Sequence, residues 1–311
     1  MSGPGTVDRP AAATRCGFIA VIGAPNAGKS TLVNTLVGAK VSIVSRKVQT
    51  TRVPVRGIAI EGASQLVFID TPGIFEPKRR LDRAMVDAAW GGASEGDVVV
   101  LLVDAAGGVG PDVARILARL GSAGGAKLLV LNKIDRLADK DALLRLTGEL
   151  TSRHAFDRVF MVSALSGDGV ADLKAHLAAI APAGPWHYPE DEISDVPMRL
   201  VAAEITREKI YDRLHEELPY ATTVETTQWK ELKDGSVRVE QTIFVERDGQ
   251  KKIVIGKGGE TIKRISSESR GELAGILEQP VHLFLFVKVR ENWGDDPERY
   301  REMGLDYPKS K

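Results

Sequence analysis

Six short apolar runs recur between Gly17 and about Ala181, and longer amphipathic stretches separate them. Several runs are apolar at consecutive positions, which is typical of strands covered on both faces. The stretches between them are long enough for the helices that connect parallel strands. The pattern predicts an α/β fold with a mostly parallel sheet. The expected strands are Phe18-Ile22, Ile58-Ile60, Leu66-Ile69, Val98-Val103, Leu128-Leu131 and Val159-Val162.

A proline-rich and acidic stretch, APAGPWHYPEDEISDVP, interrupts this alternation between Ala181 and Pro197. Such a composition neither continues a helix nor builds a core, so it predicts a domain linker. The chain of 311 residues is long enough for two domains that each bury a core. We expect a tail at 1–15, a first domain at 16–181, a linker at 182–197, a second domain at 198–295 and a carboxyl-terminal tail at 296–311.

The second domain has a mixed α+β pattern. Apolar spacing predicts a first helix that ends at Pro219, and β-rich runs follow on either side of the turn signature 233–235. The expected elements are a helix at 198–218, strands at 222–229 and 236–246, a helix at 259–275 and a last strand at 281–289.

Composition excludes several classes of protein. A single Cys16 cannot form a disulfide within the chain, which argues against a disulfide-built secreted fold. The longest apolar run, Val98-Val103, is far shorter than the roughly 18 residues that a membrane span needs. The first 15 residues lack the apolar core of a signal peptide.

The segment GAPNAGKS at Gly23–Ser30 follows the first apolar run and precedes a helix-like stretch at 31–38. It fits the phosphate-loop pattern G-x-x-x-x-G-K-[ST], in which glycines let backbone N–H groups surround phosphate oxygens. Lys29 can reach the β- and γ-phosphates, and Ser30 can supply an oxygen to Mg²⁺. The spacing and its flanks predict a nucleotide site.

Two further motifs end strands of the same sheet. Asp70-Thr71-Pro72-Gly73 places a carboxylate where it can hold Mg²⁺ through water, and the Gly73 N–H can face the γ-phosphate. Asp135, in Asn132-Lys133-Ile134-Asp135, can accept two hydrogen bonds from guanine, while Asn132 can serve the other edge of the base. Adenine lacks this donor pair, so the site favours guanine by roughly 10⁴ or more.

A base pocket is completed by Ser163 and Ala164, which follow the strand Val159-Val162, because a backbone N–H there can reach guanine O6. The stem of Lys133 can lie over the ring. The predicted GTP-binding residues are Gly23, Ala24, Pro25, Asn26, Ala27, Gly28, Lys29, Ser30, Thr31, Asp70, Thr71, Pro72, Gly73, Asn132, Lys133, Asp135, Ser163 and Ala164.

These motifs, in this order, resemble the translation-factor branch of the P-loop GTPases. The segment Gln49-Thr50-Thr51-Arg52 looks like the first switch of that family, so one of its threonines is expected to bind Mg²⁺. We favour Thr51, although the sequence alone does not choose between Thr50 and Thr51. The resemblance implies magnesium ligands at Ser30, Thr51 and Asp70, and catalytic roles for Lys29, Asn26, Thr51 and Gly73.

Ile74 stands directly after Gly73, where Ras-type GTPases place the glutamine that orients the attacking water. In many GTPases with this departure, an asparagine at the position of Asn26 helps hold K⁺ against the phosphates. The resemblance therefore implies slow intrinsic hydrolysis that is faster in K⁺ than in Na⁺. A potassium ion supplies positive charge that an arginine finger supplies elsewhere.

The segment Gly256–Gly259 is a G-x-x-G loop within a string that resembles KH domains of type II. Such a loop brings protein backbone close to a nucleic-acid backbone, and Lys257 can meet a phosphate. Residues 251–255 suit a strand by propensity, whereas the resemblance implies a short helix. Ile255, Ile262 and Ile265 can form an apolar surface beneath unstacked bases. The predicted RNA-binding residues are Lys251, Lys252, Ile255, Gly256, Lys257, Gly258, Gly259, Ile262, Lys263 and Arg264.

The formal net charge is zero, with 42 basic and 42 acidic residues, which at first argues against a nucleic-acid partner. The segment 247–270 nevertheless carries seven basic and three acidic residues, inside a half of the chain, 191–311, with 20 basic and 24 acidic. A local basic patch in an acidic half of the chain predicts that the protein binds a short single strand of RNA in one position, with little loose binding to phosphates elsewhere. A second basic run, Arg46, Lys47, Arg52 and Arg56, fits a solvated loop or an RNA contact.

From about Gly17 to the last expected strand, the chain resembles bacterial P-loop GTPases that carry one KH domain on their carboxyl side; it departs from them at its longer amino-terminal tail and at its carboxyl-terminal end. That resemblance implies binding to the 3′ end region of small-subunit (16S) ribosomal RNA, a role in 30S maturation, and a cytoplasmic monomer with peripheral membrane contact. We also consider an RNA-binding assembly factor with incidental hydrolysis, and a membrane-surface signalling GTPase. The expected fold is an α/β GTPase domain followed by a smaller α+β KH domain.

Overall fold

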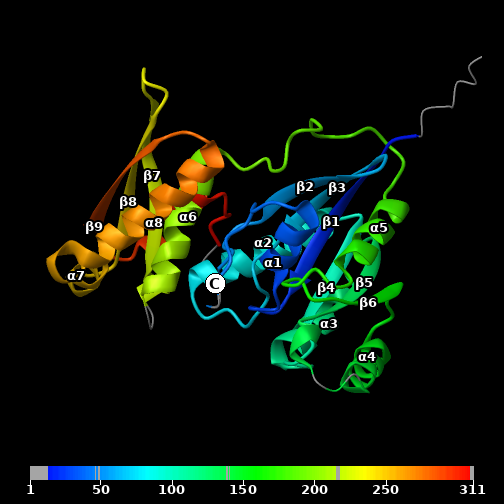
Figure 1. Cartoon of the computed structure of the whole chain (residues 1–311). Helices are drawn as coiled ribbons and strands as arrows, with labels where there is room; N and C mark the ends of the chain where they lie inside the picture. Colours follow the sequence, from blue (N-terminus) through cyan, green and yellow to red (C-terminus); the bar gives the residue numbers. More distant parts are fainter. Residues whose placement is uncertain are drawn as a thin grey trace, which may run out of the picture.

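The computed structural model describes residues 13–45, 47, 50–137, 139, 141–214 and 218–308. Its first sheet has the strand order β2-β3-β1-β4-β5-β6 (Figure 1). The strands are β1 (Arg15–Gly23), β2 (Val55–Glu61), β3 (Ser64–Asp70), β4 (Val98–Asp104), β5 (Ala126–Asn132) and β6 (Arg158–Met161). β2 pairs antiparallel with β3, and the remaining pairs are parallel. The predicted mostly parallel sheet is confirmed.

Helices cover both faces of this sheet, which explains why its strands are apolar at consecutive positions. One buried cluster joins the sheet to α1 and α5, and a second joins the opposite face to α2, α3 and α4. The helices are α1 (Lys29–Val37), α2 (Arg80–Glu95), α3 (Pro111–Leu120), α4 (Asp141–Arg153) and α5 (Val170–Ile180), with a 3₁₀ turn at Ile134–Arg136. The carboxyl ends of the central strands remain open between these layers.

The second sheet has the order β7-β8-β9, with β7 and β8 antiparallel and β8 and β9 parallel. Helices α6 and α8 pack on one face of it through two apolar clusters. The elements are α6 (Met198–Arg213), β7 (Thr222–Glu231), β8 (Val237–Val245), α7 (Asp248–Ile255), α8 (Glu260–Leu277) and β9 (Val281–Val289), with 3₁₀ turns at Leu218–Ala221 and Lys257–Gly259. Residues 248–255 form the helix implied by resemblance, so their strand propensity is overridden.

Two sequence expectations for the second half are wrong. The first helix ends at Arg213, and Leu214 is already extended and buried, whereas the sequence predicted a helix to Leu218. The expected carboxyl-terminal tail instead contains a 3₁₀ turn, Trp293–Asp295, and α9, Pro297–Met303. Tyr300 and Leu305 are buried against Ala84 and Met85 of α2. Only a few apolar side chains hold this segment in place. They are too few to give a periodic pattern in the sequence, so the helix was not predicted.

The carboxyl-terminal segment and α6 both lie beside the first domain, while α7 lies at the far end of the second domain (Figure 1). The segment 182–197 runs between the domains and makes two isolated β-bridges to the first sheet, from Ala183 to Arg15 of β1 and from Ser194 to Gly57 of β2. Within the described ranges, no helix combines the length and the apolarity that crossing a membrane requires. The expected amino-terminal tail lies outside the described residues as far as position 12.

Candidate nucleotide site and nucleic-acid interface

The phosphate loop bends between β1 and α1 with Gly28 at φ 99° and Asn26 at φ 60°. A Cβ at Gly28 would lie 2.4 Å from Asn132 Nδ2, so only glycine fits there. The loop ends at the first turn of α1, whose free backbone N–H groups favour an anion. The local sequence therefore builds a cradle for phosphate.

Lys29 is almost fully buried beneath the loop and curls back onto it. Its Nζ donates hydrogen bonds to the carbonyl oxygens of Gly23, at 3.2 Å, and Ala24, at 3.1 Å. Burial lowers the pKa of Lys29 to about 8, although the nearby Asp70 carboxylate opposes this shift. A bound phosphate group would give this ammonium group an anionic hydrogen-bond partner.

Three oxygen-bearing side chains meet beside the loop. Ser30 Oγ lies 2.9 Å from Thr51 Oγ1 and donates to Asp70 Oδ2 at 2.7 Å, and Thr51 Oγ1 donates to the same oxygen at 3.2 Å. By contrast, Thr50 Oγ1 donates to the carbonyl oxygen of Lys47. The geometry therefore brings Thr51, and not Thr50, to the oxygen cluster.

This cluster fits a magnesium ion. Oxygen donors suit a hard cation such as Mg²⁺. Burial raises the pKa of Asp70, against the hydrogen bond from Ser30 and the charge of Lys29, so this carboxylate gains from a nearby cation. Its second oxygen, Oδ1, is buried without a hydrogen bond among the described residues.

The motifs predicted to bind the base line one large cleft of about 970 Å³. Asp135 is exposed in it, and Lys133 Nζ donates to Asn26 O at 2.6 Å and to Asp104 Oδ2 at 2.7 Å. The cleft is large enough for a nucleoside. Sequence reasoning missed Tyr211 and Asp212, which line the same cleft from α6, because no motif marks them.

Asn132 lies deeper than the sequence suggested. Its Nδ2 donates to the Ala27 carbonyl at 2.8 Å, and its Oδ1 accepts from the Ala164 N–H at 2.9 Å. The side chain thus ties the phosphate loop to the turn after β6, and both of its polar ends are engaged within the protein. Ser163 is likewise buried, with its Oγ accepting from the Ser166 N–H.

The turn after β3 packs tightly against the phosphate loop. A Cβ at Gly73 would lie 3.0 Å from Pro25 Cα, and Thr71 Oγ1 donates to the Val21 carbonyl at 2.8 Å. Ile74 is 1% exposed and belongs to the apolar cluster under α2 and α3. It therefore cannot orient a water molecule, in agreement with the departure noted in the sequence.

The G-x-x-G segment joins α7 to α8. Gly256, Gly258 and Gly259 all have positive φ, at 77°, 61° and 79°, and a Cβ at Gly256 would lie 2.2 Å from Thr261 Oγ1. Lys257 is exposed at its tip. Gly256 is therefore required by the backbone of this turn, and the three glycines leave the turn open to a ligand.

Charged and apolar groups surround this turn. Lys252, Lys263 and Arg264 are exposed, Lys251 is half-buried, and Arg264 pairs with Glu260 at 2.8 Å. Ile255 and Ile262 are half-buried, as a partly open floor requires. The expectation for Ile265 is wrong, because this residue is fully buried in the core below α6. Sequence reasoning missed Ile253, which is 52% exposed beside the turn.

The described residues of the second basic run, Lys47, Arg52 and Arg56, do not form a solvated loop. Lys47 Nζ donates to the carbonyl oxygens of Tyr211 and Leu214, and Arg52 is buried over the Trp293 ring. Arg56 pairs with Glu95 and Asp195. Arg46 lies outside the described residues.

Family models match two parts of the chain. A model described as a 50S ribosome-binding GTPase matches residues 18–133, and a KH domain model matches residues 217–294. The GTPase Era of Bradyrhizobium sp. (strain BTAi1) is 63% identical over 300 residues, covering 96% of this chain and 97% of that relative. The GTPase Era of Rhizobium meliloti (strain 1021) is 64% identical over 296 residues, covering 95% and 94%.

Two solved structures are similar along most of the chain. One is Era in complex with MgGDPNP and nucleotides 1506–1542 of 16S ribosomal RNA, with a TM-score of 0.90, 37% identity, and coverage of 94% of this chain and 99% of that one. The other is a variant of Aquifex aeolicus Era bound to GDP and AlF₄⁻, with the same score, identity and coverage.

Proposed function

Because this chain belongs to the Era family of GTPases, we propose that it binds the 3′ region of 16S ribosomal RNA and assists 30S maturation. It is a GTPase that hydrolyses GTP to GDP and phosphate with Mg²⁺. The proposal depends on one observation: the same chain contains a cleft lined by the predicted GTP-binding motifs and, in its second domain, a separate G-x-x-G turn with an exposed lysine at its tip. The similarity covers 96% of this chain and 97% of the Bradyrhizobium relative, which supports the same two-domain organisation for both.

In the nucleotide site we propose that Lys29 contacts the β- and γ-phosphates and that Asp135 recognises guanine. Ser30, Thr51 and Asp70 would hold Mg²⁺, which neutralises charge on the phosphates. The Gly73 N–H would face the γ-phosphate. Asn132 would act on the base indirectly, through Ala27 and Ala164.

Hydrolysis is proposed to be slow without a partner, because the buried Ile74 replaces a polar group that could orient water. We propose that K⁺ beside Asn26 supplies part of the missing electrostatic stabilisation. Turnover measured in KCl should then exceed turnover in NaCl at equal ionic strength. An Asn26→Ala variant should lose this difference, and equal rates for the parent protein in both salts would refute the role.

In the second domain we propose that the turn at 256–259 clamps the RNA backbone, with Lys252, Lys257 and Lys263 near phosphates. Exposed Ile253 would add apolar surface beside half-buried Ile255. The boundaries expected from the sequence, 16–181 for the GTPase domain and 198–295 for the KH domain, are retained as a proposal. The carboxyl-terminal segment is added to the second domain because Trp293 Nε1 donates to the Ala221 carbonyl and Arg299 pairs with Glu225 of β7.

The RNA proposal is tested with a labelled RNA of nucleotides 1506–1542 of 16S ribosomal RNA and a GTP analogue that is not hydrolysed. Lys257→Asp combined with Gly258→Asp should weaken RNA binding at least about tenfold by charge reversal at the turn. Its GTP hydrolysis without RNA should match that of the parent. Aspartate is tolerated at positive φ, so Gly258→Asp should keep the fold.

Lys233→Asp provides a matched control, since Lys233 is exposed in the same domain in the β7–β8 turn. It should leave RNA affinity unchanged. Normal RNA binding by the double variant would remove the G-x-x-G turn from the interface. Crosslinking in cells followed by RNA sequencing identifies the bound RNA directly. Accumulation of immature 30S particles in cells with the double variant would support the maturation role.

The remaining proposals concern location and assembly. A cytoplasmic monomer with peripheral membrane contact is what the family resemblance implies, and these points stay predictions. The comparisons favour an rRNA-binding GTPase over a membrane-surface signalling GTPase. Sedimentation of purified protein tests the monomer, and flotation with anionic vesicles tests the membrane contact.

A further inference from the structure

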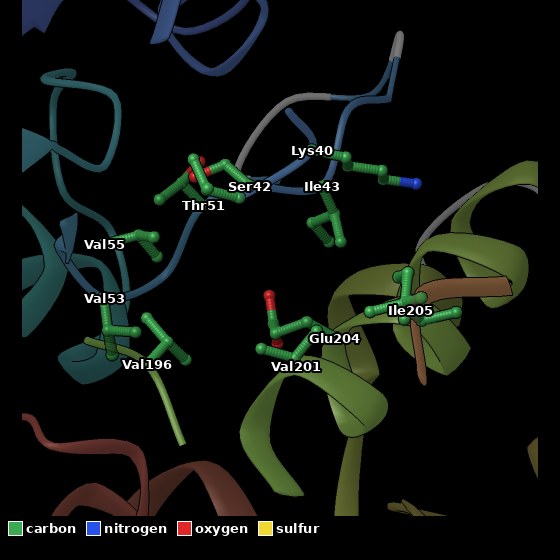
Figure 2. Close-up of a pocket in the computed structure, with 12 residues that line it drawn as sticks. Lys40, Ser42, Ile43, Thr51, Val53, Val55, Val196, Val201, Glu204 and Ile205 are labelled. Atoms are coloured by element: carbon green, nitrogen blue, oxygen red, sulfur yellow. The ribbon is translucent and has the colours of Figure 1, made fainter. Parts of the chain in front are cut away.

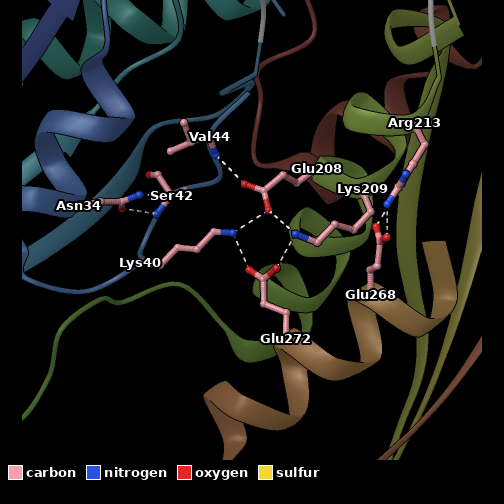
Figure 3. Close-up of polar contacts among 9 residues, drawn as sticks. All are labelled: Asn34, Lys40, Ser42, Val44, Glu208, Lys209, Arg213, Glu268 and Glu272. Atoms are coloured by element: carbon pink, nitrogen blue, oxygen red, sulfur yellow. Dashed lines mark hydrogen bonds and ion pairs between the residues drawn. The ribbon is translucent and has the colours of Figure 1, made fainter. Parts of the chain in front are cut away.

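The loop between α1 and β2, residues 38–54, contains the proposed magnesium ligand Thr51, and its described part is fastened to the second domain at both ends. At its start, Lys40 Nζ pairs with Glu208 at 2.6 Å and with Glu272 at 2.5 Å, and the Val44 N–H donates to Glu208 Oε1 at 2.8 Å. Figure 3 shows Lys40 and Lys209 alternating with the two glutamates. This network joins the loop to α6 and α8.

At the other end of the loop, Arg207 of α6 donates a hydrogen bond from Nη2 to the carbonyl oxygen of Thr50. Arg207 is only 1% exposed, and its Nε donates to Glu204 Oε1 at 2.8 Å. Burial alone would lower the pKa of Arg207, but the Glu204 carboxylate more than offsets this and raises it. The guanidinium therefore remains charged, and Glu204 holds it in one orientation.

Thr51 lies between two residues that contact the second domain. Thr50 accepts from Arg207, and the Arg52 guanidinium lies 3.5 Å from both Tyr211 Oη and the Pro219 carbonyl. A trans peptide is planar, so its carbonyl oxygen and amide hydrogen point in opposite directions. Because the Thr50 carbonyl points to Arg207, the Thr51 N–H points away from Arg207.

The Thr51 side chain reaches the oxygen cluster of Ser30 and Asp70 from this fixed peptide. Beside it, the seam between the domains contains a cavity of about 650 Å³, lined by Arg52, Glu204 and Arg207 among others, and a much smaller apolar one. Figure 2 shows apolar side chains from the loop, including Ile43 and Val53, and from the second domain, including Val201 and Ile205, lining one small cavity. Its volume is about 30 Å³, room for about one water molecule.

We propose that Arg207 is a positioning residue for GTP binding: it fixes the Thr50–Thr51 peptide so that Thr51 faces the magnesium site. This inference rests on the proposed role of Thr51 as a magnesium ligand. It assigns to the RNA-binding half of the chain a residue that completes the triphosphate site. No motif marks Arg207, which is 157 residues from its partner Thr50 in the sequence.

The effect should depend on the γ-phosphate. In GTPases the first switch is ordered by contacts to the γ-phosphate and Mg²⁺, and it is released after hydrolysis. A residue that acts only through Thr51 should therefore change affinity for a triphosphate and leave GDP affinity nearly unchanged. A merely structural role would weaken both nucleotides alike. Linkage also requires that GTP strengthen the contact between Thr50 and Arg207.

The test measures dissociation constants of the full-length protein for GDP and for a GTP analogue that is not hydrolysed, by fluorescence titration at saturating Mg²⁺. Arg207→Gln should raise the constant for the analogue about tenfold and change that for GDP less than about twofold. Arg207→Lys keeps the buried positive charge beside Glu204 but loses the planar set of guanidinium donors. This variant should therefore fold, and its affinity for the analogue should fall selectively but by a smaller factor.

Arg213→Gln is the matched control. Arg213 lies on the same helix and pairs with Glu268 of its own domain, so both affinities should stay at the parental level. Equal weakening of GDP and the analogue by Arg207→Lys, or no change in either, would overturn the inference.

A Thr51→Ala variant separates this inference from its premise. Selective loss of analogue affinity in Thr51→Ala supports Thr51 as the magnesium ligand. Adding Arg207→Gln to Thr51→Ala should then cause no further loss, because Arg207 acts through Thr51. A further tenfold loss in the double variant would show that Arg207 acts by another route and would refute the inference. An unchanged analogue affinity in Thr51→Ala would instead refute the premise.

Discussion

Replacing Asn132 with alanine should destabilise the protein even without nucleotide. The change removes two buried hydrogen bonds, the one from Nδ2 to the Ala27 carbonyl and the one from the Ala164 N–H to Oδ1. It leaves a backbone acceptor and a backbone donor without partners in a site where Asn132 is only 1% exposed.

The size of this effect follows from the two groups left behind. Each unsatisfied buried polar group costs about 1–3 kcal/mol, so the sum is about 2–6 kcal/mol. Relaxation of the phosphate loop and entry of water should keep the loss near the lower end, about 2–3 kcal/mol. With a urea m-value of about 1–3 kcal/mol per M, the unfolding midpoint falls by about 0.7–3 M.

The assay is urea unfolding of the nucleotide-free protein, followed by tryptophan fluorescence, together with titration of GDP. Asp135→Asn is the matched control, since Asp135 is exposed in the same motif. This control should keep its unfolding midpoint but shift its preference toward xanthosine nucleotides, because an acceptor becomes a donor. If Asn132→Ala has the parental midpoint and binds GDP poorly, Asn132 acts on the base directly and our reasoning is refuted.

Three other predictions address the phosphate site, the carboxyl-terminal segment and the RNA interface. Since burial lowers the pKa of Lys29 to about 8, the charged form, which we propose binds phosphate, is lost as pH rises through this value. GTP affinity should then fall between pH 7 and 9.5 in equilibrium titrations, and Lys29→Arg should remove this fall; a flat parental profile would contradict it. Tyr300→Ala should cost about 3–5 kcal/mol in urea unfolding, because its ring is fully buried against α2; a loss below about 1 kcal/mol would mean that the segment is not docked in solution. Three exposed lysines near the G-x-x-G turn, Lys252, Lys257 and Lys263, predict a shallow salt dependence of RNA binding, with a log–log slope of about −2; a slope steeper than about −5 would require a broader basic surface.

The local motifs were predictable because each depends on a short stretch of chain. The turn at Gly28 needs a residue free to adopt φ 99°, and the glycine in the sequence supplies it. Consecutive apolar residues such as 98–103 indicate a strand covered on both faces, which the two layers of helices confirm. In the G-x-x-G segment, the glycines predicted a turn that the structure places between two helices.

Other features could not be predicted, since they depend on residues far apart in the chain. Thr50 and Thr51 are equivalent in sequence, and only the tertiary structure brings the hydroxyl of Thr51 to Ser30 and Asp70. Ile265 is apolar at a position that suits a binding surface, yet the packing of α8 against α6 buries it in the core.

The sequence by itself determined the α/β architecture, the phosphate loop and the guanine motif, because backbone conformation and strand burial follow from neighbouring residues. Only the tertiary structure decided that Arg207 reaches the Thr50 carbonyl and that α9 packs on α2. These contacts join segments more than 150 residues apart, through one or two side chains each. Such contacts create no periodic pattern, so they exist only once both domains have folded and met.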